Sequence, residues 1–370
     1  MALNIACTFS CLSSLAWSES SSASFQAGAG AWSVVRVDSG MGHDRSHPSL
    51  ERDRFMLART PSFLILVLLA AMSGVVMTGC SVSPATGKRI TTMYTWEWEK
   101  NVGAEAASGL TEQFGGEVDD VIPSQYVRQI GMKLVAGIEE GVPDLDWEFT
   151  LLNSEVINAF ALPGGKVFFT RGLAEKLDSE AAMAGVLGHE IGHVTGRHGN
   201  QRMTQQFGFN AGVALGSILV GSSDADSDVR KYGQVVIPSV AVGGNLLILS
   251  YGRNHESEAD MLGMRYMERA GYDPIGQLHV MQVLDAQAQG SKQPEWLATH
   301  PHPETRISDI RELINTHYAH TQNDSSYVMN RGKYEQQMLI PLRNLAPPPK
   351  GEVNAMIGMP ALWCLHCAGE

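Results

Sequence analysis

Cysteine and basic residues are both scarce in this chain of 370 residues, and each shortage excludes a class of function. Of the five cysteines, Cys7, Cys11 and Cys80 lie in the N-terminal part, and only Cys364 and Cys367 form a close pair. This pair has redox-motif spacing but lies near the chain end without a βαβ pattern, which indicates a terminal disulfide or an inert tail, not an oxidoreductase. With 27 basic against 39 acidic residues and a formal net charge of -12, the chain has no basic excess to attract nucleic acid.

The apolar run from Phe63 to Val76 indicates the cellular compartment. It has basic residues upstream and, at about 14 to 17 residues, is short for a membrane span. The run is followed by Met77-Thr78-Gly79-Cys80, which resembles a bacterial lipobox. We therefore expect residues 56–79 to be a lipoprotein signal peptide, after whose removal Cys80 carries lipid at the mature N-terminus. The alternative is an uncleaved transmembrane anchor.

Residues 1–55 lie ahead of that signal, and Met56 is the better start because a signal peptide begins within a few residues of its charged region. They are rich in Ser and Gly with little periodicity, which predicts a disordered or untranslated leader. Ser81, after the cysteine, is not the aspartate that retains many lipoproteins in the inner membrane. The resemblance to lipoprotein signals therefore implies an outer-membrane lipoprotein that faces the periplasm of a bacterial cell envelope.

Residues 189–193 have the pattern HExxH. Ser179 can cap a helix that continues through good helix formers into this segment. At about 3.6 residues per turn, His189 and His193 lie on one face and can bind one ion, for which zinc is well suited. Glu190 is rotated by roughly 100° from His189, which suits a general base that deprotonates a water on the metal. The alternative is an exposed helix face with two unrelated histidines.

A catalytic zinc ion needs a third protein ligand, and His198 is the local candidate. Gly196 stands at the glycine position of the longer pattern HExxHxxGxxH, but that pattern requires its third histidine where this chain has Gly199. His198 therefore does not match the pattern, and a ligand from elsewhere is needed.

The distant candidate is Glu256, on a second expected helix from Arg253 to Met267. Asp260 shares its face and could accept a hydrogen bond from the free N–H of a ligand histidine, which would fix the orientation of that ring. Glu258 is turned about 200° from Glu256 and points away. The alternative for Glu256 and Asp260 is a solvated helix face.

At these residues the chain resembles the HtpX-like and CAAX-prenyl-protease-like gluzincins, zinc metallopeptidases that pair HExxH with a downstream ExxxD. The resemblance implies that His189, His193 and Glu256 bind one zinc ion per chain, that Glu190 is the base, and that Asp260 supports a ligand from behind. It spans about Ser83 to Ile314 and includes three further motifs, which are Asn158 to Gly165, Thr170 to Leu173, and Thr299-His300-Pro301 with Arg306 following.

Two β-prone runs, Ile157 to Leu162 and Lys166 to Thr170, are separated by Pro163-Gly164-Gly165 and predict a hairpin or a kinked edge. A strand edge beside a metal helix can pair with an extended substrate backbone. The resemblance implies this substrate-binding role for the stretch that begins Asn158, Ala159, Phe160 and Ala161. The alternative is an ordinary hairpin in a small sheet with Trp147 to Leu152.

His300 lies in a proline-rich loop before a helix expected from Glu304 to about Thr316. The resemblance implies that His300 and Arg306 face the zinc, where either side chain could stabilise the oxyanion of a tetrahedral intermediate. A second possibility is that His300 occupies the fourth position on the zinc in the resting enzyme. The residue types alone leave both open.

Two later apolar stretches, residues 207–221 and 233–251, lack charge but are interrupted by glycine or by Pro238. We expect both to be helices packed beside the HExxH helix, with a hairpin in or on the membrane as the alternative. The polar residues 222–230 between them predict a mobile loop, which could act as a lid.

The predicted fold class is α+β: a mostly helical gluzincin metallopeptidase fold with a small β-sheet whose edge strand borders the zinc helix. Residues 80–320 are expected to form the metallopeptidase domain, with about 44% apolar residues in the chain to supply its core. Helices are expected at Trp96 to Phe114 and Tyr126 to Ile138. Residues 321–370 are expected to be a tail with a short final element and a flexible end.

The predicted function is zinc-dependent peptide hydrolysis inside polypeptides, without a covalent intermediate, in which Glu190 deprotonates the water and then protonates the leaving amine. The resemblance implies misfolded or unassembled envelope proteins as substrates, and the lipobox implies membrane attachment. The alternative is a metal-stabilised periplasmic chaperone or assembly factor that binds unfolded outer-membrane proteins through the strand edge and seldom cuts them.

Overall fold

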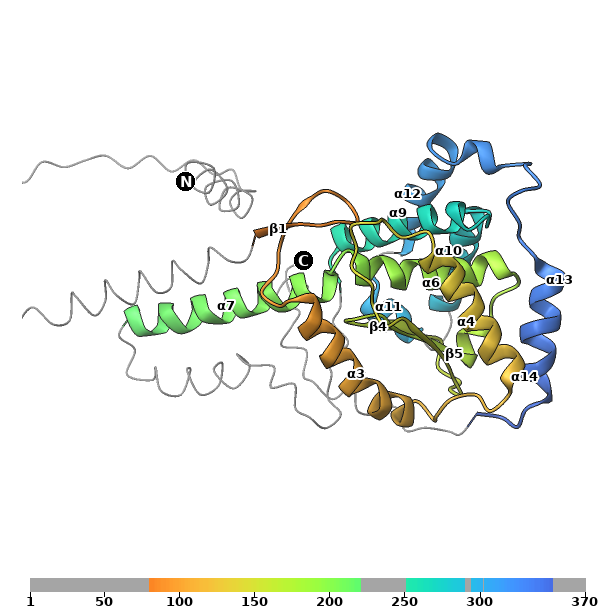
Figure 1. Cartoon of the computed structure of the whole chain (residues 1–370), viewed down its shortest axis with the longest axis horizontal. Coiled ribbons are helices and arrows are strands. Elements are labelled where there is room, and N and C mark those ends of the chain that lie inside the picture. Colours follow the sequence, from red (N-terminus) through yellow and green to blue (C-terminus); the bar gives the residue numbers. More distant parts are fainter. Residues whose placement is uncertain (1–79, 221–250, 290–293, 302, 349–370) are drawn as a thin grey trace, which may run out of the picture. The chain divides into compact units, whose positions relative to one another are not determined.

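The computed structural model describes residues 80–220, 251–289, 294–301 and 303–348 (Figure 1). The expected leader 1–55, the signal peptide 56–79, the loop 222–230, most of the stretch 233–251 and the pair Cys364 and Cys367 lie outside these residues, as does the side chain of Cys80. Within the described part, no helix combines the length and the apolar character that a membrane span requires.

The described part is mostly helical with two small sheets, which confirms the predicted α+β class. The strands are β1 (Cys80–Val82), β2 (Arg89–Thr91), β3 (Glu148–Leu152), β4 (Ala159–Leu162) and β5 (Lys166–Thr170). The α-helices are α3 (Trp96–Gln113), α4 (Val121–Val135), α5 (Arg171–Ala174), α6 (Glu180–Thr195), α7 (His198–Val220), α9 (Arg253–Arg269), α10 (Ile275–Ala288), α11 (Glu295–Thr299), α12 (Pro303–Thr316), α13 (Arg331–Tyr334) and α14 (Ile340–Asn344). A 3₁₀ turn (Ala319–Thr321) and a π-helical segment (Glu335–Leu339) complete the described elements.

The larger sheet has the strand order β3-β5-β4, with β3 parallel and β4 antiparallel to the central β5. Side chains alternate between its faces, so that Val167 and Phe169 join the main core with α4 and α6, whereas Phe168 joins a smaller cluster with α3. The hairpin predicted around Pro163-Gly164-Gly165 is confirmed, with both glycines at positive φ. β4 is therefore an edge strand of this sheet.

Helix α6 lies between the sheet and α9 and is buried along its whole length (Figure 1). The Ser179 side chain accepts a hydrogen bond from the backbone N–H of Ala182 at 3.3 Å, so the predicted N-cap is confirmed. Burial on all sides explains why the sequence of α6 is apolar and small apart from its functional residues.

Glycines allow α6 and α9 to approach each other closely. A Cβ at Gly192 would lie 2.8 Å from the carbonyl oxygen of Ala259, and a Cβ at Gly263 would lie 2.8 Å from the backbone nitrogen of His189. Both separations are shorter than van der Waals contact allows, so a larger residue at either position would push the helices apart. The close approach brings one face of α9 against the HExxH turn.

The C-terminal segment packs on the core and does not form a separate tail up to residue 344. Tyr334, Met338 and Leu342 are fully buried in the main cluster, and the Tyr334 hydroxyl donates to the carbonyl oxygen of Ala174 at 2.7 Å. The main core therefore includes residues C-terminal to residue 320. These three buried residues recur every four positions, as expected for one face of a helical segment.

Candidate metal centre

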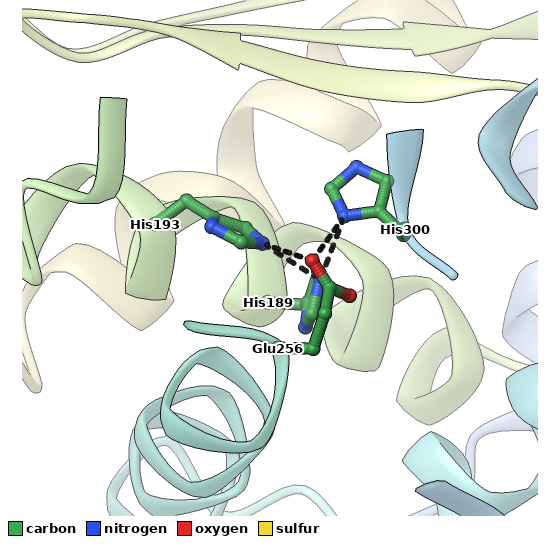
Figure 2. A group of neighbouring side chains, drawn as sticks. All are labelled: His189, His193, Glu256 and His300. Carbon is green, nitrogen blue, oxygen red and sulfur yellow. Dashed lines mark hydrogen bonds and ion pairs between the residues drawn. The ribbon is translucent and has the colours of Figure 1, made fainter. Parts of the chain in front are cut away.

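Three imidazoles and one carboxylate converge between α6, α9 and the residue that follows α11 (Figure 2). Nε2 of His189 lies 3.0 Å from Nε2 of His193 and 3.3 Å from Nδ1 of His300. Oε1 of Glu256 lies 3.5 Å from Nε2 of His193 and 3.2 Å from Nδ1 of His300. The four atoms, one from each residue, lie within 4.8 Å of one another, and we call these residues the donor group.

Asp260 and Arg306 hold the donor group from behind. Oδ1 of Asp260 lies 2.9 Å from Nδ1 of His189, the ring nitrogen opposite its Nε2. The Arg306 guanidinium donates to both Asp260 oxygens, at 2.7 and 2.6 Å, and to Oε2 of Glu256 at 2.7 Å. Gln277 donates a further bond to Oδ1 of Asp260 at 2.9 Å. The carboxylates of Glu256 and Asp260 therefore have fixed orientations.

Burial keeps the donor imidazoles neutral. Removal from water lowers the pKa of His189 and His193 below the ordinary 6.5, with Arg306 and neighbouring histidines adding to the shift. Burial also lowers the pKa of His300 to about 4. Neutral rings carry a free lone pair, which is the form that binds a metal.

The carboxyls of Glu256 and Asp260 differ in their electrostatics. Burial raises the pKa of the Glu256 carboxyl, although Arg306 and His189 oppose the shift. Burial also acts to raise that of Asp260, but here the charge of Arg306 and the bond to His189 outweigh it, so that the pKa lies well below its usual range. Asp260 is thus the permanently charged partner of His189 and Arg306.

The donor group fits a divalent metal of the kind that prefers nitrogen and carboxylate ligands. Its members are at most 3% exposed, and neutral imidazoles and a carboxylate are the lone-pair donors that such a metal binds. The opposite nitrogen of His189 already contacts a carboxylate, which is the arrangement that orients a metal-binding imidazole. The site predicted from HExxH and Glu256 is therefore brought together by the fold.

Glu190 lies beside the donor group and not within it. Its carboxylate is 1% exposed, and Oε1 has no hydrogen-bond partner and lies 3.7 Å from Nε2 of His300. Burial raises the pKa of this carboxyl. A buried carboxylate oxygen without a hydrogen-bond partner is costly to maintain, so its presence here indicates a function.

His300 and Arg306 lie differently from each other. Nδ1 of His300 points into the donor group, which is the geometry of the second possibility raised by the sequence, a histidine at a ligand position. Arg306 instead donates hydrogen bonds from all three of its guanidinium nitrogens to the carboxylates of Asp260 and Glu256. One of these nitrogens also lies 3.3 Å from Nδ1 of His189. This arrangement differs from the oxyanion contact that the resemblance implies for Arg306.

The edge strand β4 leaves part of its backbone free. The backbone N–H of Thr170 donates to the carbonyl oxygen of Asn158. Because alternate residues of an antiparallel strand bond to the same neighbour, the backbone N–H and C=O of Phe160 also face β5. Those of Ala159 and Ala161 face the open edge. Consistent with this alternation, the carbonyl oxygen of Ile157 accepts from the backbone of Trp296. No described residue outside the sheet bonds to the backbone of Ala159 or Ala161.

Two aromatic residues that contact the site were not recognised in the sequence. The Trp296 ring stacks on His300 with centroids 4.5 Å apart, and Tyr251 stacks on His193 at 4.0 Å. His198 lies behind His193, with their Nδ1 atoms 2.9 Å apart, and it is not a member of the donor group. The sequence offers His198 as a third ligand, whereas the structure places it three residues past the end of α6 and against the far side of the His193 ring.

Comparison with known proteins agrees with this geometry. The model of peptidase family M48 matches residues 122–314. A protein of Escherichia coli O157:H7 named beta-barrel assembly-enhancing protease is 34% identical over 203 residues, which cover 54% of this chain and 40% of the relative. Its namesake from Yersinia pestis is 34% identical over 215 residues, 56% of this chain and 43% of the relative.

A more distant relative is the mitochondrial metalloendopeptidase OMA1 of Schizosaccharomyces pombe, which is 29% identical over 237 residues, 62% of this chain and 65% of the relative. The chain thus spans about four tenths of the length of the two bacterial relatives. The family match covers more than half of the chain and includes all of His189, Glu190, His193, Glu256, Asp260, His300 and Arg306. The chain therefore belongs to peptidase family M48, whose members are metal-dependent peptidases.

Proposed function

We propose that this chain is a zinc-dependent endopeptidase that cuts misfolded or unassembled proteins of the bacterial envelope. The observation that carries the proposal is the convergence of His189, His193 and Glu256 from two helices, with the buried carboxylate of Glu190 beside them. Two histidines and one glutamate are a ligand set used by catalytic zinc, which keeps a further position open for water or substrate.

In this proposal each residue has a defined task. When bound, zinc supplies Lewis acidity at the scissile carbonyl and makes a water molecule more acidic. Glu190 takes the proton from that water and passes it to the leaving amine, so that no covalent enzyme intermediate forms. Asp260 holds His189 in the correct tautomer, and Arg306 keeps the carboxylates of Glu256 and Asp260 in place.

The edge of β4 is the proposed substrate-binding element. Backbone groups of Ala159 and Ala161 at the open edge can pair with an extended substrate, and this pairing is largely indifferent to substrate side chains. Unfolded polypeptides present extended segments, whereas folded proteins present few. This preference suits a protease that removes proteins which have failed to fold.

His300 is proposed to be a ligand in the resting state. Its Nδ1 lies 3.3 Å from Nε2 of His189 and 3.2 Å from Oε1 of Glu256, and stacking on Trp296 holds the ring there. Its withdrawal would open the position that water or a substrate carbonyl needs. Such a ligand restrains proteolysis until a substrate engages the site.

The cellular location is proposed from the lipobox at Met77 to Cys80 together with the bacterial relatives, whose name refers to the assembly of β-barrels. The chain would be anchored by lipid on Cys80 to the outer membrane and would face the periplasm. Labelling of cells with a radioactive fatty acid tests the anchor. We expect label in the wild type and none in Cys80→Ser, and label in both or in neither contradicts it.

Zinc content and casein cleavage, measured on the same preparation, test the activity. We expect about one zinc per wild-type chain and chelator-sensitive cleavage, with zinc retained and cleavage lost in Glu190→Gln. The exposed Glu312→Gln is the matched control and should behave as wild type. A zinc-loaded protein that binds an unfolded β-barrel protein but releases no chelator-sensitive fragments would support the chaperone alternative.

A further inference from the structure

His193 has a ring nitrogen that the donor group does not use. While its Nε2 faces His189 and Glu256, its Nδ1 lies 2.9 Å from Nδ1 of His198, the first residue of α7. His198 is fully buried. Two neutral imidazoles that form a hydrogen bond through their Nδ1 atoms share one proton there. One Nδ1 therefore donates and the other accepts.

The turn between α6 and α7 is built to bring these rings together. Arg197 adopts a left-handed backbone conformation with φ of 57°, which is unfavourable for a residue with a side chain. Its buried guanidinium holds this turn by donating to Oε1 of Glu99 at 3.2 and 3.0 Å. A Cβ at Gly196 would lie 2.5 Å from Nε2 of His198, so glycine leaves the space that the His198 ring fills.

A carboxylate lies on the far side of the His198 ring. Oε1 of Glu258, on α9, is 3.6 Å from Nε2 of His198, and Oε2 of Glu258 accepts from Nζ of Lys88 at 2.6 Å. The negative charge favours the tautomer of His198 with its proton on Nε2. Nδ1 of His198 is then an acceptor, Nδ1 of His193 carries a proton, and the lone pair of His193 lies on Nε2.

We propose that His198, backed by Glu258 and Lys88, is a positioning residue that holds His193 in the tautomer and ring orientation needed to bind the metal. The inference rests on the proposed metal site but concerns a residue outside it. It also gives Glu258 a role, although Glu258 points away from Glu256 on the other side of α9.

The two histidines of HExxH would then be supported in different ways. His189 contacts the Asp260 carboxylate directly, whereas His193 reaches the Glu258 carboxylate through a neutral imidazole. A carboxylate makes its imidazole partner a stronger base than an intervening neutral ring does. His193 is therefore the weaker of the two ligands and the one more sensitive to the loss of its partner.

Competition with a zinc chelator at equilibrium tests the proposal without any substrate. His198→Leu, which removes both ring nitrogens, should raise the zinc dissociation constant about 10- to 100-fold. His198→Asn should recover most of that loss, since its side-chain oxygen can accept the same N–H. Glu258→Gln should have a smaller effect, and Lys88→Met less than about 3-fold because this side chain is 61% exposed.

Matched controls are His317→Leu, at an exposed position, and Glu268→Gln, on the same helix as Glu258 but paired with the exposed His320. Both should bind zinc as the wild type does. Nitrogen NMR of the zinc-loaded wild type gives a readout that does not depend on any variant folding, and it should show His193 protonated at Nδ1 and His198 at Nε2.

The outcomes separate this inference from the proposed function. A wild type that binds no divalent metal overturns both. Normal zinc binding that is unchanged in His198→Leu, or a His193 without a proton on Nδ1, overturns the positioning role and leaves the metal site standing. A loss in His198→Leu that His198→Asn does not recover indicates a packing role and also overturns it.

Discussion

Replacement of Glu190 by glutamine should lower activity and at the same time stabilise the metal-free protein. Loss of a general base lowers turnover by about 10²- to 10⁴-fold, which corresponds to about 3 to 5 kcal/mol in the barrier. The carboxylate is 1% exposed and its Oε1 has no partner, and a buried polar group without a partner costs about 1 to 3 kcal/mol, more when charged. A neutral amide of nearly the same shape removes much of that cost.

The stabilisation should depend on pH, with a defined sign. Burial raises the pKa of Glu190 above the ordinary 4.5, so the folded state binds this proton more tightly than the unfolded state does. The contribution to folding is fully present below pH 4.5 and is lost as the pH rises toward the folded-state pKa. Glutamine does not titrate, so the advantage of the variant should grow between about pH 4.5 and pH 7.

Urea unfolding in excess chelator at pH 4.5 and pH 7 measures this effect, with Glu312→Gln as the exposed control. We expect the free energy of unfolding of Glu190→Gln to exceed that of the wild type by about 1 to 3 kcal/mol at pH 7 and by less at pH 4.5. A variant that is less stable than the wild type at pH 7, or one that cleaves casein at the wild-type rate, would refute the reasoning.

Four further changes test other parts of the site and fold. Asp260→Asn removes the charge that contacts His189 and Arg306 and should weaken zinc binding about 10- to 100-fold in a chelator competition, whereas equal affinity would exclude its supporting role. Gly192→Ala places a Cβ 2.8 Å from Ala259 on α9 and should lower the free energy of unfolding by about 1 to 3 kcal/mol in urea, while Gly109→Ala, with open space around it, should not. His300→Ala should raise peptide turnover if this residue is a resting ligand, and a fall of about 10²-fold or more would instead support the oxyanion role. Leu342→Ala should cost about 2 to 5 kcal/mol by urea unfolding and Leu345→Ala, which is only partly buried, distinctly less; equal small effects would mean that residues 331–344 do not belong to the core.

Local elements and the side chains that share a face of one helix could be predicted from the sequence because both depend on short separations along the chain. The Ser179 cap, the one-turn spacing of His189 and His193, and the shared face of Glu256 and Asp260 all follow from helix geometry. The hairpin at Pro163-Gly164-Gly165 likewise follows from residues that adopt turn conformations. Pairing the two helices needed the family resemblance, because periodicity does not say which helix packs on which.

The start of α4 shows the limit of periodicity even within one helix. The apolar pattern predicted a helix from Tyr126 to Ile138, whereas α4 begins at Val121, where the Asp120 side chain accepts from the N–H of Ile122 at 2.9 Å, and ends at Val135. Val121 and Ile122 are exposed apolar residues and so do not follow the buried face of the helix. A cap residue, not the apolar stripe, sets this boundary.

Only the tertiary structure decided which distant side chains meet at the metal centre. Nδ1 of His300 contacts Nε2 of His189 across 111 positions of sequence, and Lys88 contacts Glu258 across 170. The tertiary structure also decided the partners of Arg306, whose guanidinium nitrogens all contact Asp260, Glu256 or His189. The sequence by itself determined the helices and which side chains share a face on each, since these depend on backbone hydrogen bonds between near neighbours. Which partners hold those ligands depends on the path of the whole chain and on close packing at glycines, and no local pattern records that path.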